Sequence, residues 1–408
     1  MSLLLRNRGA ILLLMGNILL VFTGIGLVIP VMPTYLRELH LNGSILGFMV
    51  AAFSLSQLLF SPFAGRLSDK IGRKKNIVAG IVLFAVSEWL FGAASQPLWL
   101  FVSRVLGGMG AALVMPAIMA YVADVTSKEE RAQGMGFINA AITTGFIIGP
   151  GIGGYLAGFG VRAPFYAAAA AGAIAAVITI LVLPDTKAQE AASGEARTAE
   201  KQPGLLSQLL LSYKEPYFLS LIIVLVASFG LANFETVFGL YVDHKFGFTT
   251  KDIAFIITVG SIAGAVVQLT IFGWILERFG ERRVISCSLG TAGVFVFLML
   301  IAGSYWSVLV VTFILFLSID LLRPALGTQM SKMANEQQGF VAGLNSAFTS
   351  MGNILGPLAA GVLFDMNIHF PYASAAVVLL LCFLLSIRAA AKAKANAGSP
   401  QAAKTNGG

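Results

Sequence analysis

The sequence predicts an all-α integral membrane protein, with twelve transmembrane helices arranged as two pseudo-symmetric six-helix bundles. Three observations lead to this fold class. Hydrophobic residues make up 57% of the chain and charged residues 11%, with a mean hydropathy of +0.84, which excludes an ordinary soluble globular domain. Many apolar segments are long enough to cross about 30 Å of hydrocarbon. The glycine and proline patterns of the first half also return in the second half at a nearly constant offset.

Twelve apolar segments predict the transmembrane helices. They lie at residues 10–33, 44–64, 76–95, 98–120, 134–158, 163–183, 217–241, 252–275, 284–303, 306–330, 338–364 and 371–388. The first segment follows Arg6 and Arg8 and could imitate a signal peptide. It is too long for one, and no small-residue cleavage site precedes polar sequence, so we interpret it as a retained helix.

The predicted domains follow from these segments. We expect an N-terminal bundle at 1–184, a cytoplasmic linker at 185–216, a C-terminal bundle at 217–390 and a disordered cytoplasmic tail at 391–408. The linker is rich in Ala, Gln, Glu, Lys, Ser and Gly, which favours a solvated segment. A short amphipathic helix on the membrane surface, at 205–213, is an alternative for part of it.

Charge predicts the orientation in the membrane. If both termini are cytoplasmic, 21 of the 27 Lys and Arg residues lie on the cytoplasmic face. The outer face then keeps Arg37, Arg162, Lys245 and Lys251. This bias follows the positive-inside rule and accounts for the net charge of +8 without a nucleic-acid partner.

A glycine-rich stretch at 145–154 lies inside an apolar segment. If this segment is a helix, one of its faces carries no side chains. The members of the stretch are Gly145, Gly149, Pro150, Gly153 and Gly154. Glycines about one turn apart let another helix approach closely, and the proline bends the helix. At an offset of 207, Gly352, Gly356, Pro357 and Gly361 repeat the pattern. The repetition indicates a duplication, with a binding site near the bilayer midplane between the two repeats.

Further motifs indicate a family. Gly65-x3-Asp69-x2-Gly72-Arg73 returns at an offset of 208 as Gly273-x3-Glu277-x2-Gly280, and Pro116 returns as Pro324. With Arg104 in Leu100-x3-Arg104-x2-Gly107-Gly108 and the stretch 145–154, the chain resembles the major facilitator superfamily over nearly its whole length. The segments Gly26-Leu-Val-Ile-Pro30-Val-Met-Pro33, Ser228–Glu235 and Asp320-Leu-Leu-Arg323-Pro324 resemble those of the twelve-span drug:proton antiporters of the NorA and Bmr type. The resemblance implies the major facilitator fold and proton-coupled export by alternating access.

Charged residues inside the predicted spans are candidates for proton coupling, because burying a charge there is costly. Glu235 has aromatic neighbours and no basic residue within one turn of its own helix, and such an environment favours the neutral form of a carboxylate. Asp320 and Arg323 share a helix face, so they either take part in coupling or neutralise each other as a structural pair. The resemblance implies that Glu235 and Asp320 are the protonation sites.

Two more charges lie within the spans of the N-terminal half. Arg104 keeps its charge, since guanidinium does not deprotonate in proteins, and could hold water or a carboxylate during proton transfer. A packing role is the alternative. For Glu88 we favour a structural polar contact within the N-terminal bundle.

The loop motif predicts a cytoplasmic gate formed by Gly65, Asp69, Gly72, Arg73 and Asp124. Asp69 would cap the N-terminus of the helix that begins near Gly339, while Arg73 pairs with Asp124. The alternative is that the basic residues of this loop only set the orientation of the protein in the membrane.

The candidate drug site combines aromatic and amide side chains on spans that line the cavity in the superfamily: Phe22, Gln57, Phe146, Phe234, Phe316 and Asn353. Flat aromatic walls and a carboxylate suit a lipophilic cation. We therefore expect a multidrug exporter in the plasma membrane, acting as a monomer with protons, small-molecule substrates and lipid as partners. Transport of a single defined sugar or metabolite is the alternative.

Enzymatic or ATP-driven function is not expected. His40, His244 and His369 all fall in outer loops, Cys287 and Cys382 lie in separate spans, and no Gly-x4-Gly-Lys-Ser/Thr sequence is present. No cofactor or metal is predicted.

Overall fold

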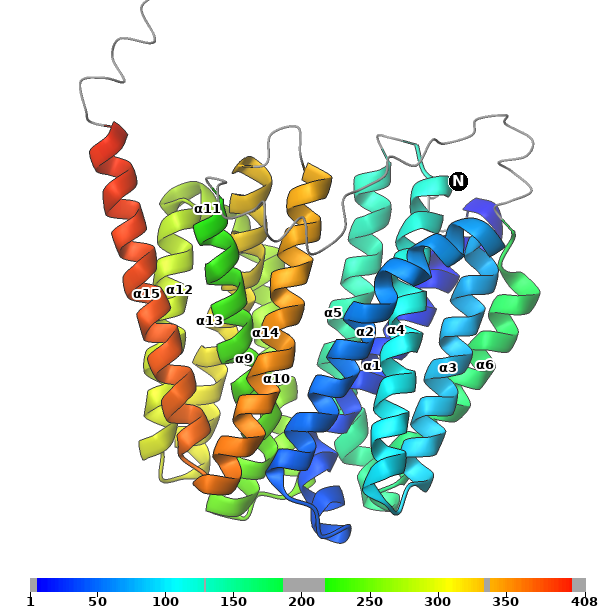
Figure 1. Ribbon diagram of the computed structural model, residues 1–408, viewed down its shortest axis with the longest axis horizontal. Helices are drawn as coiled ribbons and strands as arrows, with labels where there is room; N and C mark the ends of the chain where they lie inside the picture. The colour runs from blue at the N-terminus through cyan, green and yellow to red at the C-terminus, as the bar shows by residue number, and fades with distance from the viewer. Residues whose placement is uncertain (1–5, 128–129, 186–216, 334–337, 398–408) are drawn as a thin grey trace, which may run out of the picture. The chain divides into compact units, whose positions relative to one another are not determined.

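The computed structural model describes residues 6–127, 130–185, 217–333 and 338–397 (Figure 1). Over these ranges it contains thirteen α-helices, one short 3-10 helix and no strand. Twelve of the helices are long and apolar enough to cross a membrane. The predicted all-α class and the twelve spans are therefore confirmed.

The helices follow the predicted segments closely. They are α1 (Arg6–Glu38), α2 (Gly43–Ile71), α3 (Arg73–Ala93), α4 (Pro97–Val125), α5 (Arg131–Leu156), η2 (Ala157–Phe159), α6 (Ala163–Val182), α9 (Phe218–Phe246), α10 (Thr250–Thr270), α11 (Phe272–Phe279), α12 (Glu281–Ile301), α13 (Tyr305–Met333), α14 (Gln338–Met366) and α15 (Phe370–Ala397). Most of the predicted linker, including the possible helix at 205–213, lies outside the described residues.

Two helix boundaries differ from the prediction. The span expected at 252–275 is divided at Ile271, where α10 ends and the eight-residue α11 begins. The Thr270 hydroxyl donates to the carbonyl oxygen of Val266 at 2.6 Å, a back-bond that often bends helices. At the other end of the chain, α15 continues to Ala397, into the segment expected to be a disordered tail. The Ala and Lys residues there are strong helix formers.

The chain divides into two compact units. Unit 1 comprises Met1–Gln202, Thr236–Val259 and Pro357–Asp365, and unit 2 comprises Pro203–Glu235, Gly260–Gly356 and Met366–Gly408. Apart from the boundary between Gln202 and Pro203, the unit boundaries therefore fall within α9, α10 and α14. The division into bundles at 184 and 217 stays a prediction.

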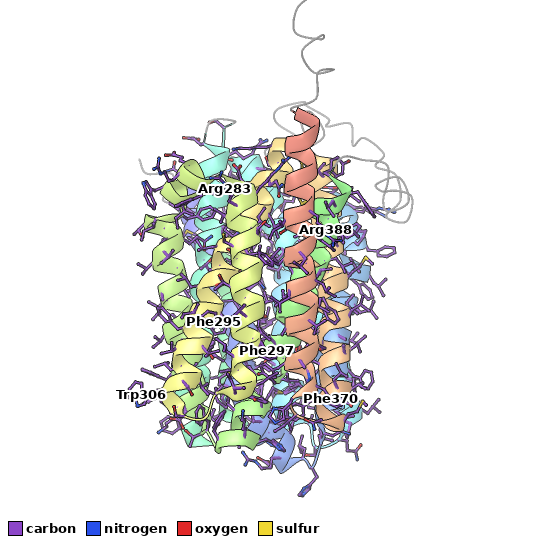
Figure 2. All side chains as sticks on the ribbon, turned by 90° about the vertical axis from the view of Figure 1, so that its left-hand side faces the viewer. Arg283, Phe295, Phe297, Trp306, Phe370 and Arg388 are labelled. Atoms are coloured by element: carbon purple, nitrogen blue, oxygen red, sulfur yellow. The ribbon has the colours of Figure 1, made fainter. Side chains whose placement is uncertain are left out.

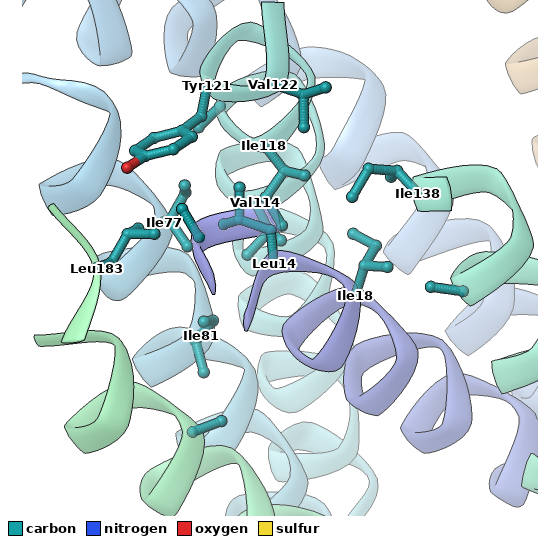
Figure 3. Close-up of a cluster of buried hydrophobic side chains, with 14 of the residues drawn as sticks. Leu14, Ile18, Ile77, Ile81, Val114, Ile118, Tyr121, Val122, Ile138 and Leu183 are labelled. Atoms are coloured by element: carbon teal, nitrogen blue, oxygen red, sulfur yellow. The ribbon is translucent and has the colours of Figure 1, made fainter. Parts of the chain in front are cut away.

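The core of unit 1 is built from apolar residues one helical turn apart (Figure 3). Leu14 and Ile18 of α1 and Ile77 and Ile81 of α3 are fully buried, as is Ile118 of α4. Because such pairs lie on one helix face, they turn the same side of each helix toward its neighbours. In lipid this arrangement is held by close van der Waals packing, since the bilayer is as apolar as the core.

Four labelled residues lie toward the two ends of unit 2 (Figure 2). Arg283 and Arg388 lie near one end, whereas Trp306 and Phe370 lie near the opposite end, with 71% of Trp306 exposed. Basic residues are typical of the cytoplasmic side and aromatic residues of membrane interfaces. The arrangement agrees with the predicted orientation, and which end is cytoplasmic stays a prediction.

The internal repeat is visible in the backbone. Gly72 joins α2 to α3 with φ 101° and ψ 150°, and Gly280 joins α11 to α12 with φ 77° and ψ 153°. Essentially only glycine adopts this conformation. The two glycines correspond at the repeat offset of 208, so both copies of the loop motif make the same turn.

Candidate functional site

The glycine face of α5 packs directly on α1. A methyl group placed on Gly149 would lie 2.8 Å from the carbonyl oxygen of Thr23 and 3.0 Å from the α-carbon of Gly26. A methyl group on Gly145 would lie 2.7 Å from the carbonyl oxygen of Leu19. The close approach expected for this face is therefore present, and any side chain at Gly149 would push the two helices apart.

The second copy of the motif makes the equivalent contact between α14 and α9. A methyl group on Gly352 would lie 2.6 Å from Cβ of Ser228, and one on Gly356 would lie 2.6 Å from the carbonyl oxygen of Phe229. In each repeat, then, the glycine-rich helix packs on the first helix of that repeat. The duplication inferred from the sequence extends to helix packing.

The last glycine of each copy contacts a helix of the other sequence half, within unit 1. Gly154 of α5 lies against Ala254 of α10, and Gly361 of α14 lies against Gly47 of α2, where an added methyl group would be 3.1 Å from the α-carbon. Close by, the Asp365 carboxylate accepts hydrogen bonds from backbone N–H groups at the start of α2. These contacts lie at the ends of the helices that are expected to face outward.

Arg73 is the centre of the predicted gate. Its Nε donates to Oδ2 of Asp124 on α4 at 3.2 Å, and its Nη1 donates to the hydroxyl of Ser68 and to the carboxylate of Asp69. Asp124 is nearly buried, with 9% of its side chain exposed, whereas Asp69 is 62% exposed. The structure thus joins the ends of α2, α3 and α4 through one guanidinium. The cap that Asp69 is expected to place on α14 near Gly339 stays a prediction.

Arg104 and Glu88 form a buried ion pair between α4 and α3. Nη2 of Arg104 lies 3.4 Å from Oε1 of Glu88, and the guanidinium carbon lies 4.0 Å from the centre of the Phe91 ring. Oε2 of Glu88 and Nε of Arg104 are buried without a hydrogen-bond partner in the structure. The cost of burying the two charges is therefore offset by their attraction to each other and, for Arg104, by the Phe91 ring.

Glu235 has a basic partner that its own helix does not reveal. Nη2 of Arg323 on α13 lies 4.0 Å from Oε1 of Glu235, with 60% of the Arg323 side chain and 37% of the Glu235 side chain exposed. The absence of a basic residue near Glu235 on its own helix suggested a carboxylate without a partner, and that interpretation is wrong, because the partner comes from a helix distant in sequence.

Asp320 lies one turn before Arg323 on α13 and faces α10. Its carboxylate is half-buried and packs against the α-carbon of Gly264, where an added Cβ would be 2.7 Å from Cγ of Asp320. Among the described residues, Arg323 and Glu235 lie close enough to Asp320 to interact with it electrostatically. Two carboxylates and one guanidinium therefore form a single cluster on α9 and α13.

The predicted aromatic residues form two separate pairs. The rings of Phe22 and Phe146 meet edge to face in unit 1, with centroids 5.0 Å apart. In unit 2, Phe234 and Phe316 meet in the same manner at 6.3 Å. Gln57 and Asn353, the amides of the predicted drug site, are both half-buried.

A cavity of about 230 Å³ lies within unit 2, bordered by α9, α12, α13, α14 and α15. Most of its lining is apolar, including Phe234, Leu231 and Leu322. The polar groups of the lining are Ser228, Arg323, Asn345 and Thr349. An apolar pocket with a few polar groups is the usual form of a small-molecule site.

Comparison with known proteins identifies the family. The model of the Major Facilitator Superfamily matches residues 14–269 and 220–406. The chain belongs to the major facilitator superfamily. Among solved structures, a bacterial homologue of the human lysosomal transporter Spinster matches with a TM-score of 0.77 at 15% identity, covering 93% of this chain and 96% of that one. The nucleoside transporter NupG matches with a TM-score of 0.71 at 16% identity, covering 94% and 98%. At these sequence identities, the two matches show that the fold is shared.

Relatives at higher identity confirm the resemblance to the NorA and Bmr type. Multidrug resistance protein 2 of Bacillus subtilis is 48% identical over 370 residues, covering 91% of this chain and 92% of the relative. Multidrug resistance protein 1 of the same organism is 45% identical over 92% and 95%. The quinolone resistance protein NorA of Staphylococcus aureus is 44% identical over 88% and 91%. This superfamily member is a multi-pass membrane protein.

Several residues of the site were not found from the sequence. The cap by Asp365 and the packing of Gly264 on Asp320 depend on helices far apart in the chain. The sequence does carry one signal for Gly264, because Gly260 precedes it by one helical turn within an apolar segment. For Asp365, the only signal is a carboxylate that directly follows an apolar span.

Proposed function

We propose that this protein is a proton-coupled antiporter that exports lipophilic, often cationic, drugs and dyes from the cytoplasm by alternating access. The observation that carries the proposal is the cluster of Glu235, Asp320 and Arg323 beside an apolar cavity. Such a cluster can hold either protons or a drug cation, because both neutralise the same carboxylates.

The carboxylates supply the coupling step. A drug cation binds from the cytoplasm when Glu235 and Asp320 are deprotonated, and protons that arrive from outside displace it. Arg323 keeps one positive charge beside Glu235, which limits how many further charges the cluster accepts. One proton moving inward releases about 1.4 kcal/mol per unit of pH difference and about 2.3 kcal/mol per 100 mV.

The aromatic residues supply the drug site. Phe234 connects the cavity lining to its edge-to-face partner Phe316, and Phe22 and Phe146 form a second aromatic surface. Aromatic faces attract cations and flat apolar rings without demanding one shape. This tolerance favours a range of lipophilic substrates over a single sugar or metabolite.

The names of the relatives support the same substrate class. Two are called multidrug resistance proteins and one a quinolone resistance protein. We further propose that the protein lies in the plasma membrane with both termini in the cytoplasm, acts as a monomer and needs no cofactor.

Dye transport by the purified full-length protein in lipid vesicles tests the proposal. A pH gradient is imposed across the vesicles, and accumulation of a fluorescent monovalent cation is followed with and without a proton uncoupler. We expect gradient-driven transport that the uncoupler abolishes and that ATP does not replace. Transport that persists with the uncoupler, or that requires ATP, would contradict proton coupling.

A further inference from the structure

The contact between α10 and α13 contains two glycines on one helix and two large side chains on the other. Gly260 faces the ring of Phe316, where an added Cβ would lie 2.6 Å from Cδ2. One turn later, Gly264 faces Asp320. Both glycines therefore provide room for a residue that belongs to the proposed drug or proton site.

Gly264 touches the carboxylate of Asp320 itself. An added Cβ would overlap Oδ2 and would lie 2.7 Å from Cγ and 3.1 Å from Cβ of Asp320. Rotation of the Asp320 side chain moves Oδ2 and Cγ, but Cβ is held by the backbone of α13. A methyl group at position 264 would thus drive the carboxylate into another rotamer and would also press on its stem.

The internal repeat shows that the helix contact alone does not require this arrangement. At the repeat offset of 208, the positions equivalent to Gly264, Phe316 and Asp320 are Ser56, Gly108 and Ala112. There the bare backbone belongs to α4, since an added Cβ on Gly108 would lie 2.8 Å from Cβ of Ser56 on α2. In the second repeat the bare backbone lies on the opposite helix, α10, while α13 carries Phe316 in place of Gly108 and Asp320 in place of Ala112.

The charges around Asp320 depend on where its carboxylate points. Arg323 belongs to the same helix, and Glu235 approaches from α9. The charged residues of α10 are Lys251 and Asp252, at its N-terminal end, several turns from Gly264. A rotated carboxylate would change its distances to Arg323 and Glu235 and its access to water, and these determine how readily it accepts a proton.

We propose that Gly264 is a positioning residue for proton coupling: its bare backbone holds the Asp320 carboxylate against α10, in the setting from which the carboxylate takes up a proton in place of the bound drug cation. This inference rests on the proposed function, because it assumes that Asp320 is a coupling residue. It adds a residue on α10, a helix that contributes no charge to the cluster.

The test measures binding of a fluorescent monovalent cation to the purified full-length protein as a function of pH. The variants are Gly264→Ala, Asp320→Asn and the double variant. Gly260→Ala serves as a packing control on the same helix face, and Gly327→Ala serves as a control on α13, where an added methyl group meets nothing within 4 Å. Uncoupler-sensitive export in vesicles is measured alongside.

We expect Gly264→Ala to shift the pH midpoint of binding by about one unit and to reduce coupled export about tenfold. Gly260→Ala should leave the midpoint in place, and Gly327→Ala should resemble the parent protein. In the Asp320→Asn background, Gly264→Ala should cause no further shift, because the group that it positions no longer titrates.

An unshifted midpoint in Gly264→Ala, or an equal shift with and without Asp320, would overturn the inference and leave the proposed function intact. If Asp320→Asn itself changes neither the pH dependence nor export, the proposed function fails, and the inference fails with it. Should Gly264→Ala not insert into the membrane, the variant Gly264→Ala with Asp320→Ala should restore insertion by removing the overlapping carboxylate. Failure to restore it would also count against the contact.

Discussion

The Asp365 carboxylate, near the end of α14, accepts a 2.9 Å hydrogen bond from the backbone N–H of Ser44 in the first turn of α2. The N–H of Gly43 donates to the same carboxylate at 2.8 Å. The first N–H groups of a helix lack partners within the helix, and a negative charge there is favoured by the helix dipole. The contact therefore joins a helix of the first sequence half to one of the second.

We expect Asp365→Ala to favour the state in which these helix ends separate. A cysteine at Thr34, whose hydroxyl lies 3.1 Å from that of Thr250, would then react faster with an impermeant thiol reagent added outside. The measurement uses a background without Cys287 and Cys382. Asp252→Ala is the matched control, because Asp252 caps α10 locally through Thr249. Each variant loses a cap worth about 1 kcal/mol, and equal reactivity in both would contradict the prediction.

Gly149→Leu should abolish export, because a side chain there would collide with the backbone of α1. Gly136→Leu, on the same helix, should keep export, since an added Cβ at Gly136 meets nothing within 4 Å. Dye efflux from cells with equal protein abundance measures both. Full activity of Gly149→Leu would show that α5 and α1 do not need this close contact.

Asp69→Asn should weaken the ion-pair cluster around Arg73 and slow turnover, while drug binding remains. Lys74→Gln removes a positive charge of the same motif but leaves the ion pairs of Arg73 in place. This variant therefore tests whether the basic residues act only through the orientation of the protein in the membrane. The rate of dye efflux and equilibrium dye binding are compared in the two variants. Identical turnover in Asp69→Asn and the parent protein would exclude a gating role for Asp69.

Glu88→Ala should lower the free energy of unfolding by about 3–5 kcal/mol, because it leaves the buried Arg104 without its carboxylate. Replacing both residues, as Glu88→Leu with Arg104→Met, should recover most of that stability. Thermal denaturation of the purified protein measures the effect. If the double variant also transports normally, Arg104 has a packing role and no part in proton transfer.

Glu235→Gln and Asp320→Asn should each flatten the pH dependence of dye binding. In the parent protein, binding of a cationic dye should weaken as the pH falls, because protonation removes the negative charges that attract the dye. The amide variants imitate the protonated state at every pH. Binding titrations at several pH values measure this, and an unchanged pH dependence in the double variant would contradict the assignment.

The sequence by itself determined the membrane class, the twelve spans and the internal repeat. Hydrophobicity over about 20 residues reports on membrane crossing regardless of what the helix contacts. Glycine spacing predicted the close face of α5, and the equal offsets of Gly72 and Gly280 predicted two copies of one turn. These features depend on local composition and backbone conformation, so they can be predicted from the sequence.

Only the tertiary structure decided which side chains meet. Arg323 lies beside Glu235 although 88 residues separate them in the chain, and Asp365 caps a helix that begins 322 residues earlier. The spacing of Gly260 and Gly264 indicates a small-residue face on α10, but only the packing of α13 shows that Asp320 lies against Gly264. Helix faces can be inferred from periodicity, but the partner of each face is set by packing among helices that are distant in sequence.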